Sequence, residues 1–170
     1  MALPSNSRPI NNAGFTLIEI MMVMAFVAII GGFTLIVSLD SYREYNFHSD
    51  RDLLVSALQR ARSQAEGNVC LGASCTDGLP HGVSIHPADH PTDYVIFQTI
   101  DANPDYAHRD ATQDVLIETN PATVFTPGSA EFVFGSLSGN PTTPGTITLS
   151  AAGHSSTVTI GQEGQITWTN

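Results

Sequence analysis

The chain has 170 residues, and its 16 acidic and six basic residues give a formal net charge of −10. All six basic residues are arginines. This excess of acid argues against non-specific nucleic-acid binding and against docking on anionic lipids through a basic patch. Two cysteines are too few for a scaffold of several disulfides or for a four-cysteine metal site.

Residues 15–39 form the most apolar segment of the sequence, and Glu19 is its single charged residue. A helix of this length spans about 38 Å, more than the roughly 30 Å hydrocarbon core of a bilayer. The segment has no amphipathic period, so lipid or tightly packed neighbours must surround it. We therefore expect a transmembrane helix. A secretory signal peptide is the alternative, but the apolar run is long, carries an acid near its start and is not followed by an A-x-A-like site.

The charges that flank this segment predict its orientation. Arg8 precedes the segment, whereas Asp40, Arg43 and Glu44 follow it. The positive-inside rule then places the N-terminal end in the cytoplasm and the rest of the chain outside. We expect a single-pass membrane protein with an extracytoplasmic body.

Glu19 is the most informative residue of the apolar segment. A carboxylate in hydrocarbon costs several kcal/mol unless it is paired or protonated. No lysine, arginine or histidine lies within residues 15–39. Either Glu19 lies close enough to the interface to stay hydrated, or its cation comes from another chain or from an amine created by processing.

The motif around Glu19 suggests a family. Residues 13–19, Ala-Gly-Phe-Thr-Leu-Ile-Glu, resemble the cleavage motif of type IV prepilins and type II secretion pseudopilins. In that family a membrane-embedded prepilin peptidase cuts after the glycine and N-methylates the new first residue. The resemblance implies a leader peptide over residues 1–14, cleavage after Gly14 and methylation of Phe15. It also supplies a cation, because the family glutamate is thought to pair with the N-terminal amine of a neighbouring subunit during assembly.

The apolar segment departs from many members of this family in one respect. Those members carry a proline in the region that corresponds to residues 33–37, and this chain has none there. Gly31 and Gly32 lie slightly earlier. They give either local flexibility, at roughly 1 kcal/mol each relative to alanine, or close helix packing in the membrane through small residues.

The helix is expected to continue to about Glu66 and to stop at Gly67 and Asn68. Apolar residues recur mostly at three- and four-residue steps along one stripe, made of Tyr42, Phe47, Leu54, Leu58, Ala61 and Ala65. The sequence thus predicts one helix of about 50 residues. Residues 15–39 form its transmembrane half and residues 40–66 its amphipathic half.

Residues 67–170 lose the helical period and read as a β-rich head, because β-branched runs alternate with Pro, Gly and Asn turns. The expected strands are 82–86, 94–100, 115–118, 123–125, 131–134, 146–150, 157–160 and 165–169. A helix followed by a run of strands predicts an α+β fold in which the long helix packs on an antiparallel sheet. This arrangement is pilin-like.

A second stretch narrows the resemblance. Residues 52–65 resemble a helix of H-type minor pseudopilins and FimT-like minor pilins. Those proteins commonly continue with a cysteine near Val69-Cys70, and they end in strand pairs like residues 147–149 and 158–160. The resemblance implies a structural subunit of the inner membrane and then of a pilus or pseudopilus. Its partners would be other pilin-like subunits, the prepilin peptidase and the inner-membrane assembly platform.

Cys70 and Cys75 enclose a short loop. If the head faces an oxidising exterior, the two cysteines can form a disulfide. Two free thiols and two ligands of a metal site are the alternatives.

The acid-rich stretch 101–114 contains Asp101, Asn103 and Asp105, which match the first ligands of a calcium loop. The match fails afterwards, because Tyr106 replaces the turn glycine and Thr112 stands where a bidentate glutamate is needed. Asx-type turns in a solvated loop explain the same residues. His81, His86, His90 and His108 also lie among loop residues, and we expect them at the surface.

No sequence motif points to catalysis. A phosphate-binding glycine loop, a nucleophile elbow and an H-E-x-x-H helix are all missing from the sequence. We expect a structural subunit without catalytic residues or cofactor. Past Leu39 the chain has five arginines against fifteen acids, which argues against DNA binding, although Arg60, Arg62 or Arg109 could form a local patch. The alternative is a membrane-anchored or secreted binding domain or enzyme unrelated to pili.

Overall fold

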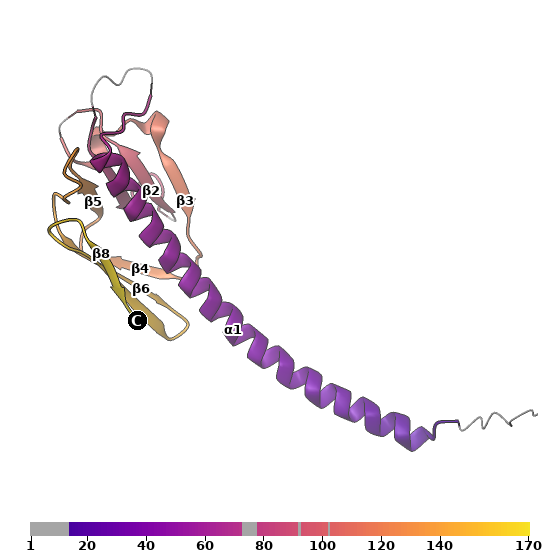
Figure 1. Ribbon diagram of the computed structural model, residues 1–170. Coiled ribbons are helices and arrows are strands. Elements are labelled where there is room, and N and C mark those ends of the chain that lie inside the picture. Colours follow the sequence, from indigo (N-terminus) through magenta and orange to yellow (C-terminus); the bar gives the residue numbers. More distant parts are fainter. Residues whose placement is uncertain (1–13, 73–77, 92, 102) are drawn as a thin grey trace, which may run out of the picture. The chain divides into compact units, whose positions relative to one another are not determined.

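The computed structural model describes residues 14–72, 78–91, 93–101 and 103–170, apart from the side chains of residues 35–40. The fold is α+β, with an N-terminal apolar helix and antiparallel sheets (Figure 1). The helix α1 runs over Leu17–Glu66. Two short 3-10 helices, η1 (Tyr106–His108) and η2 (Ala111–Gln113), lie between the second and third strands.

All eight predicted strands are confirmed, with ends that differ by at most three residues from the expected ones. They are β1 (His81–Ile85), β2 (Asp93–Gln98), β3 (Val115–Glu118), β4 (Val124–Pro127), β5 (Glu131–Phe134), β6 (Gly145–Ala151), β7 (His154–Ile160) and β8 (Ile166–Thr169). The largest difference is the start of β7. Ala152 and Gly153, with φ of +50° and +86°, form a tight two-residue turn, so His154 already pairs with Ala151.

The chain forms two compact units, Met1–Ser41 and Tyr42–Asn170. We call the second unit the head. It contains two four-stranded antiparallel sheets, with the strand orders β3-β2-β1-β5 and β4-β6-β7-β8. Each sheet has two edge strands, so hydrogen bonding between the sheets does not close a barrel in the described residues.

The end of α1 is a Schellman motif. The N–H of Val69 donates to the carbonyl of Gln64 at 2.9 Å, and the N–H of Asn68 donates to that of Ala65 at 3.1 Å. Asn68 adopts the left-handed conformation, with φ of +51°. These bonds satisfy carbonyls that have no partner within the helix. The predicted stop at Gly67 and Asn68 is therefore confirmed.

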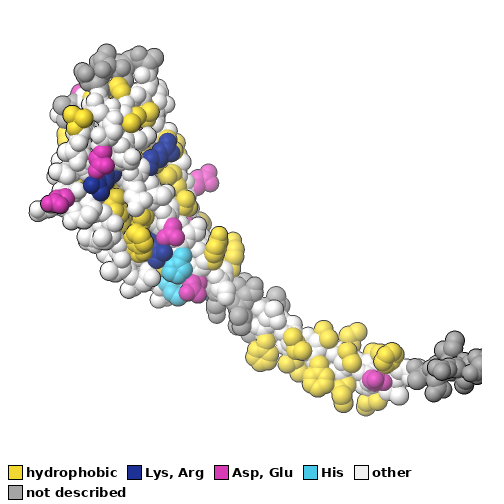
Figure 2. All heavy atoms as spheres, in the orientation of Figure 1, with side chains coloured by type: hydrophobic (Ala, Val, Ile, Leu, Met, Phe, Trp, Pro, Cys, Tyr) yellow, Lys and Arg dark blue, Asp and Glu magenta, His cyan; other side chains and the backbone are white. Residues whose placement is uncertain are grey.

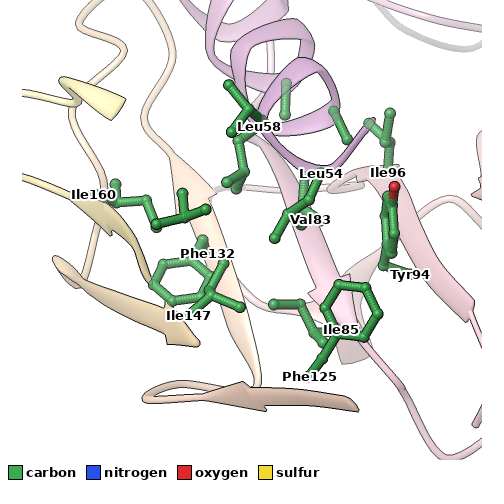
Figure 3. Packing of buried hydrophobic residues seen from close by; sticks show 14 of the residues in the cluster. Leu54, Leu58, Val83, Ile85, Tyr94, Ile96, Phe125, Phe132, Ile147 and Ile160 are labelled. Carbon is green, nitrogen blue, oxygen red and sulfur yellow. The ribbon is translucent and has the colours of Figure 1, made fainter. Parts of the chain in front are cut away.

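The hydrophobic core of the head brings together buried side chains of α1 and of both sheets. Figure 3 shows Leu54 and Leu58 of α1 near Val83 of β1, with Ile147 and further core residues around them. Five residues of the predicted helical stripe are buried: Phe47, Leu54, Leu58, Ala61 and Ala65. The inclusion of Tyr42 in that stripe was wrong, because its side chain is 64% exposed.

Candidate functional site

The first part of α1, Leu17–Thr34, is apolar and exposed. In the described part of the chain, Leu17–Thr34 is the one stretch that is long and apolar enough to cross a membrane, and none of it is buried. Figure 2 shows hydrophobic side chains covering this part of the helix. Exposure of so many large apolar groups is costly in water. By length and composition, this stretch fits a membrane anchor or a signal sequence.

The predicted processing motif lies at the start of this helix. Thr16 caps the helix, because its Oγ1 and its carbonyl both accept a hydrogen bond from the amide of Glu19, at 3.3 and 3.1 Å. Phe15 precedes the cap and is 78% exposed. A Cβ added to Gly14 meets no atom within 4 Å. The bond between Gly14 and Phe15 thus lies in exposed chain just before the helix.

The Glu19 carboxylate lies in the first turn of α1 and has no ion pair or hydrogen bond with any residue that the structure describes. The N-terminal end of a helix carries a partial positive charge, which favours an acid there by about 0.3–1 kcal/mol. That gain is smaller than the several kcal/mol needed to bury a carboxylate in hydrocarbon. No described residue therefore supplies a full positive charge to the Glu19 carboxylate.

Gly31 and Gly32 lie inside the exposed half of α1. A Cβ added to either glycine meets nothing within 4 Å. The nearby Thr34 hydroxyl donates to the carbonyl of Ile30 at 2.9 Å, a local bond that slightly weakens helices. Local flexibility and close packing against another helix both stay open as roles for the two glycines.

The segment after α1 is held to the first sheet by two buried side chains. Gln98 of β2 accepts from the amide of Leu71 at 2.7 Å and donates to its carbonyl at 3.2 Å. His81 of β1 donates through Nε2 to the carbonyl of Val69 at 2.9 Å. Cys70 lies between these anchors and is disulfide-bonded, which agrees with the predicted bridge. The expected partner, Cys75, lies outside the described residues.

The expectation that His81 lies at the surface was wrong. Its side chain is completely buried in β1, and its Nδ1 has no hydrogen-bond partner among the described residues. Burial lowers the pKa of the imidazole, while the bond to Val69 opposes this shift. The ring is therefore neutral in the folded head, with its proton on Nε2.

The residues of the predicted calcium loop form local turns. Asp101 accepts the amide of Asn103 at 2.8 Å, and Asp105 caps η1 by accepting the amide of His108 at 2.8 Å. The His108 ring beside Asp105 lowers the pKa of that carboxyl. Within the described residues, no three His, Cys, Asp or Glu side chains converge as a metal site would require. The hydrogen bonds match the Asx-type interpretation.

Arg109 connects the acid-rich stretch 101–114 to the turn between β1 and β2. It pairs with Asp89 at 2.5 Å and with Asp114 at 2.8 Å, and its guanidinium lies 3.8 Å from the ring centre of Tyr106. Burial and the Asp89 carboxylate raise the pKa of Tyr106 to about 12. Arg62 is likewise paired, with Glu66 at 2.8 Å. These pairs neutralise two of the three arginines considered for a basic patch.

The head also has an open groove of about 300 Å³ beside the start of its helical segment. Its lining comes from α1, from the turn between β3 and β4, and from the end of β6 and the following turn. The groove is defined by Arg43, Asn46, Phe47, Asn120, Ala122 and Ala152, and we call it the Arg43 groove. Sequence reasoning missed it, because its residues come from three distant segments and share no motif.

A buried carboxylate lies next to this groove. Asp50 of α1 is 9% exposed and accepts a short hydrogen bond from the hydroxyl of Thr123, which lines the groove. Burial raises the pKa of Asp50, and the Thr123 bond partly offsets this shift. Asp50 is thus committed to an interaction inside the head.

Comparisons with family models, with curated proteins and with solved structures found no match for this chain.

Proposed function

We propose that this protein is a minor pilin or pseudopilin, a subunit that prepilin peptidase processes between Gly14 and Phe15 and that assembles into a type IV pilus or a type II secretion pseudopilus. The observation that carries the proposal is Glu19, an acid without a partner in the described residues, at the start of the apolar stretch Leu17–Thr34, none of which is buried. The role is structural, without turnover.

In this proposal, processing creates the positive charge that assembly uses. Cleavage after Gly14 would create an α-amine on Phe15, four residues before Glu19. When a subunit leaves the bilayer for a filament core, its Glu19 needs a cation, and the amine of a neighbouring subunit provides one. Pairing offsets much of the cost of burying both charges. The pair thus favours the correct axial register more than it adds stability.

The proposal also assigns a role to each half of α1 and a location to the head. In a pilin-like arrangement, the first half of α1 anchors the subunit and the second half packs on the sheets of the head. The burial of Leu54, Leu58 and Ala61 supports this division of the helix. The subunit would wait in the inner membrane with its head outside the cytoplasm. Its partners would be other pilin-like subunits, the peptidase and the assembly platform.

Mass spectrometry of the mature N-terminus tests the processing step. We expect the chain isolated from its own cells to begin with N-methylated Phe15. Gly14→Lys should leave an uncleaved precursor, whereas Gly31→Ala, a glycine substitution outside the motif, should be processed normally. A chain that keeps its first fourteen residues would contradict the proposal. Cleavage beyond residue 30 would instead support the alternative, a secreted domain released by signal peptidase.

Filament incorporation tests the role of Glu19. Glu19→Gln removes the charge and keeps the size of the side chain, so we expect normal processing but at least about a tenfold loss of the subunit from sheared filaments. Glu44→Gln is the matched control, because Glu44 is an exposed acid of the head that lies 3.8 Å from His48. Normal incorporation of the Glu19→Gln chain would contradict the proposed pairing.

A further inference from the structure

Arg43 lies just past the point where the chain leaves its apolar segment. It follows Leu39, the last residue of that segment, by four residues along α1. A helix rises about 1.5 Å per residue, so Arg43 lies about 6 Å past Leu39 along the helix axis. The headgroup layer on each side of a bilayer is about 5–7 Å thick. With residues 15–39 as a membrane anchor, Arg43 therefore lies at the depth of the lipid headgroups.

Two exposed tyrosines accompany Arg43. Tyr42 and Tyr45 are 64% and 71% exposed, and they lie about one helical turn apart on the same face of α1. Tyrosine is enriched where a membrane helix passes through the headgroup layer, because its ring is apolar and its hydroxyl is polar. A bilayer therefore accounts for the exposure of both rings, including that of Tyr42, which fits the apolar stripe but is not buried in the head.

The Arg43 guanidinium is free to bind an anion. Arg43 is exposed and takes part in no ion pair or hydrogen bond with any residue that the structure describes. The neighbouring acid, Glu44, instead lies 3.8 Å from His48. A guanidinium binds a phosphate group through two parallel hydrogen bonds. Arg43 therefore offers a phosphate a cation that no acid of the described chain occupies.

The lining of the groove adds to this cation. Asn46 and Asn120 supply side-chain amides, which donate hydrogen bonds, and none of the described lining residues is an acid. The carboxylate of Asp50, next to the groove, is buried and accepts a hydrogen bond from Thr123. Phe47, which is 2% exposed, gives the groove an apolar floor. Cationic, amide and apolar groups together complement a phosphate that is attached to short alkyl groups, as in a phospholipid headgroup.

We propose that the head docks on the extracytoplasmic surface of the membrane, with the phosphate of a zwitterionic phospholipid in the Arg43 groove and the rings of Tyr42 and Tyr45 in the headgroup layer. The inference rests on the proposed function, because that function gives the chain a membrane anchor and places the head outside the cytoplasm. A zwitterionic lipid fits because the chain has a net charge of −10, which opposes contact with an anionic surface. The contact holds the head against the bilayer before the subunit enters a filament.

Site-specific photo-cross-linking of the full chain in vesicles of phosphatidylcholine tests this contact. A benzophenone amino acid replaces Ala122, which is exposed and lines the groove. In a second chain it replaces Gln162, which is exposed in the turn between β7 and β8. We expect mass spectrometry to find an adduct with one phospholipid for the Ala122 position and little for the Gln162 position. Equal yields at the two positions, an adduct only between two copies of the chain, or the absence of any adduct would overturn the proposal.

Variants of the Ala122 cross-linking chain separate a bound headgroup from simple tethering of the head near the bilayer. Arg43→Gln should lower the yield of the lipid adduct about tenfold, the change expected for a lost charge-assisted hydrogen bond. Replacing Tyr42 and Tyr45 together by serine should also lower it. Arg60→Gln is the matched control and should leave the yield unchanged, because Arg60 is likewise exposed and without an ion pair among the described residues but lies close to the end of α1. An undiminished yield in Arg43→Gln or in the double tyrosine variant, or an equal loss in Arg60→Gln, would overturn the proposal.

The vesicle experiment needs no processing of the chain, so it fails separately from the proposed function. The mature N-terminus of the chain isolated from its own cells is measured beside it. Methylated Phe15 together with an undiminished lipid adduct in Arg43→Gln would overturn the docking and leave the proposed function standing. Cleavage beyond residue 30 would overturn the proposed function and the docking with it, because the mature chain would lose its anchor.

Discussion

The two halves of α1 use the same kinds of side chain in opposite ways. Over Leu17–Thr34, large apolar residues cover every side of the helix and are exposed. Over the part that belongs to the head, Leu54, Leu58 and Ala61 are completely buried. The apolar side chains of Leu17–Thr34 have no buried contacts, while those of the other half have their partners within the chain. Apolar content therefore does not predict burial along this helix, whereas the spacing of apolar and polar residues predicted it for five of the six residues in the stripe.

The two halves of α1 also differ in how their acidic residues are bonded. Glu19 in the first half has no partner among the described residues, and Asp50 in the second half accepts a hydrogen bond from Thr123. The head satisfies its buried acid internally, as buried polar groups require. The exposed half offers its acid no such partner among the described residues. This contrast connects the fold to the proposed assembly mechanism.

The largest expected effect comes from truncating a buried aliphatic side chain in the head, compared with the same truncation in the exposed half of α1. Leu58→Ala should lower the free energy of unfolding of the head by about 3 kcal/mol, because it opens a cavity in a packed core. Ile29→Ala, at a residue that is 56% exposed, should leave that free energy unchanged. Denaturant titration of the full chain in detergent measures both values. Equal losses in the two variants would contradict the comparison.

A smaller effect is expected in how the free energy of unfolding depends on pH, through the buried His81. Its pKa is lowered in the folded head, so at pH below its ordinary value of 6.5 the unfolded chain binds more protons than the folded chain. The free energy of unfolding should therefore fall as the pH drops from 7 towards the lowered pKa. His81→Gln should reduce that slope, measured by thermal unfolding at a series of pH values. A slope that is the same in both chains would show that another group titrates.

The smallest effect concerns an exposed leucine of the head. Leu137 has a φ of +63° and is 72% exposed, and its amide donates to the carbonyl of Ala65 at the end of α1. Leu137→Gly should raise the free energy of unfolding by roughly 0.5–1 kcal/mol, because glycine adopts this conformation without steric cost. Leu116→Gly in β3, an exposed leucine in a strand, should instead destabilise the head. If both Leu137→Gly and Leu116→Gly destabilise the head, the positive φ of Leu137 does not strain its backbone.

Much of the head could be predicted from local patterns. The turn residues between β-branched runs located all eight strands, and Gly67-Asn68 located the end of α1. Burial was harder to predict. His81 stands beside proline and glycine in the sequence, yet it is completely buried because β1 is paired on both sides, with β2 and β5. Tyr42 fits the helical stripe but is exposed.

One of the two candidate sites could be predicted from the sequence and the other could not. The motif from Gly14 to Glu19 could be recognised in the sequence, because its residues are adjacent in the chain. The Arg43 groove could not, because Arg43, Asn120 and Ala152 are far apart in the chain and meet through sheet topology.

The sequence by itself determined the positions of the helix and strands and the lone acid in an apolar segment. These features depend on periods, turns and charges within a few neighbouring residues. Tertiary structure alone decided which side chains are buried together, why His81 is neutral and where the head has a groove. Those properties arise from contacts between segments that are distant in sequence, and their free energies exist only once the sheets and the helical segment have packed.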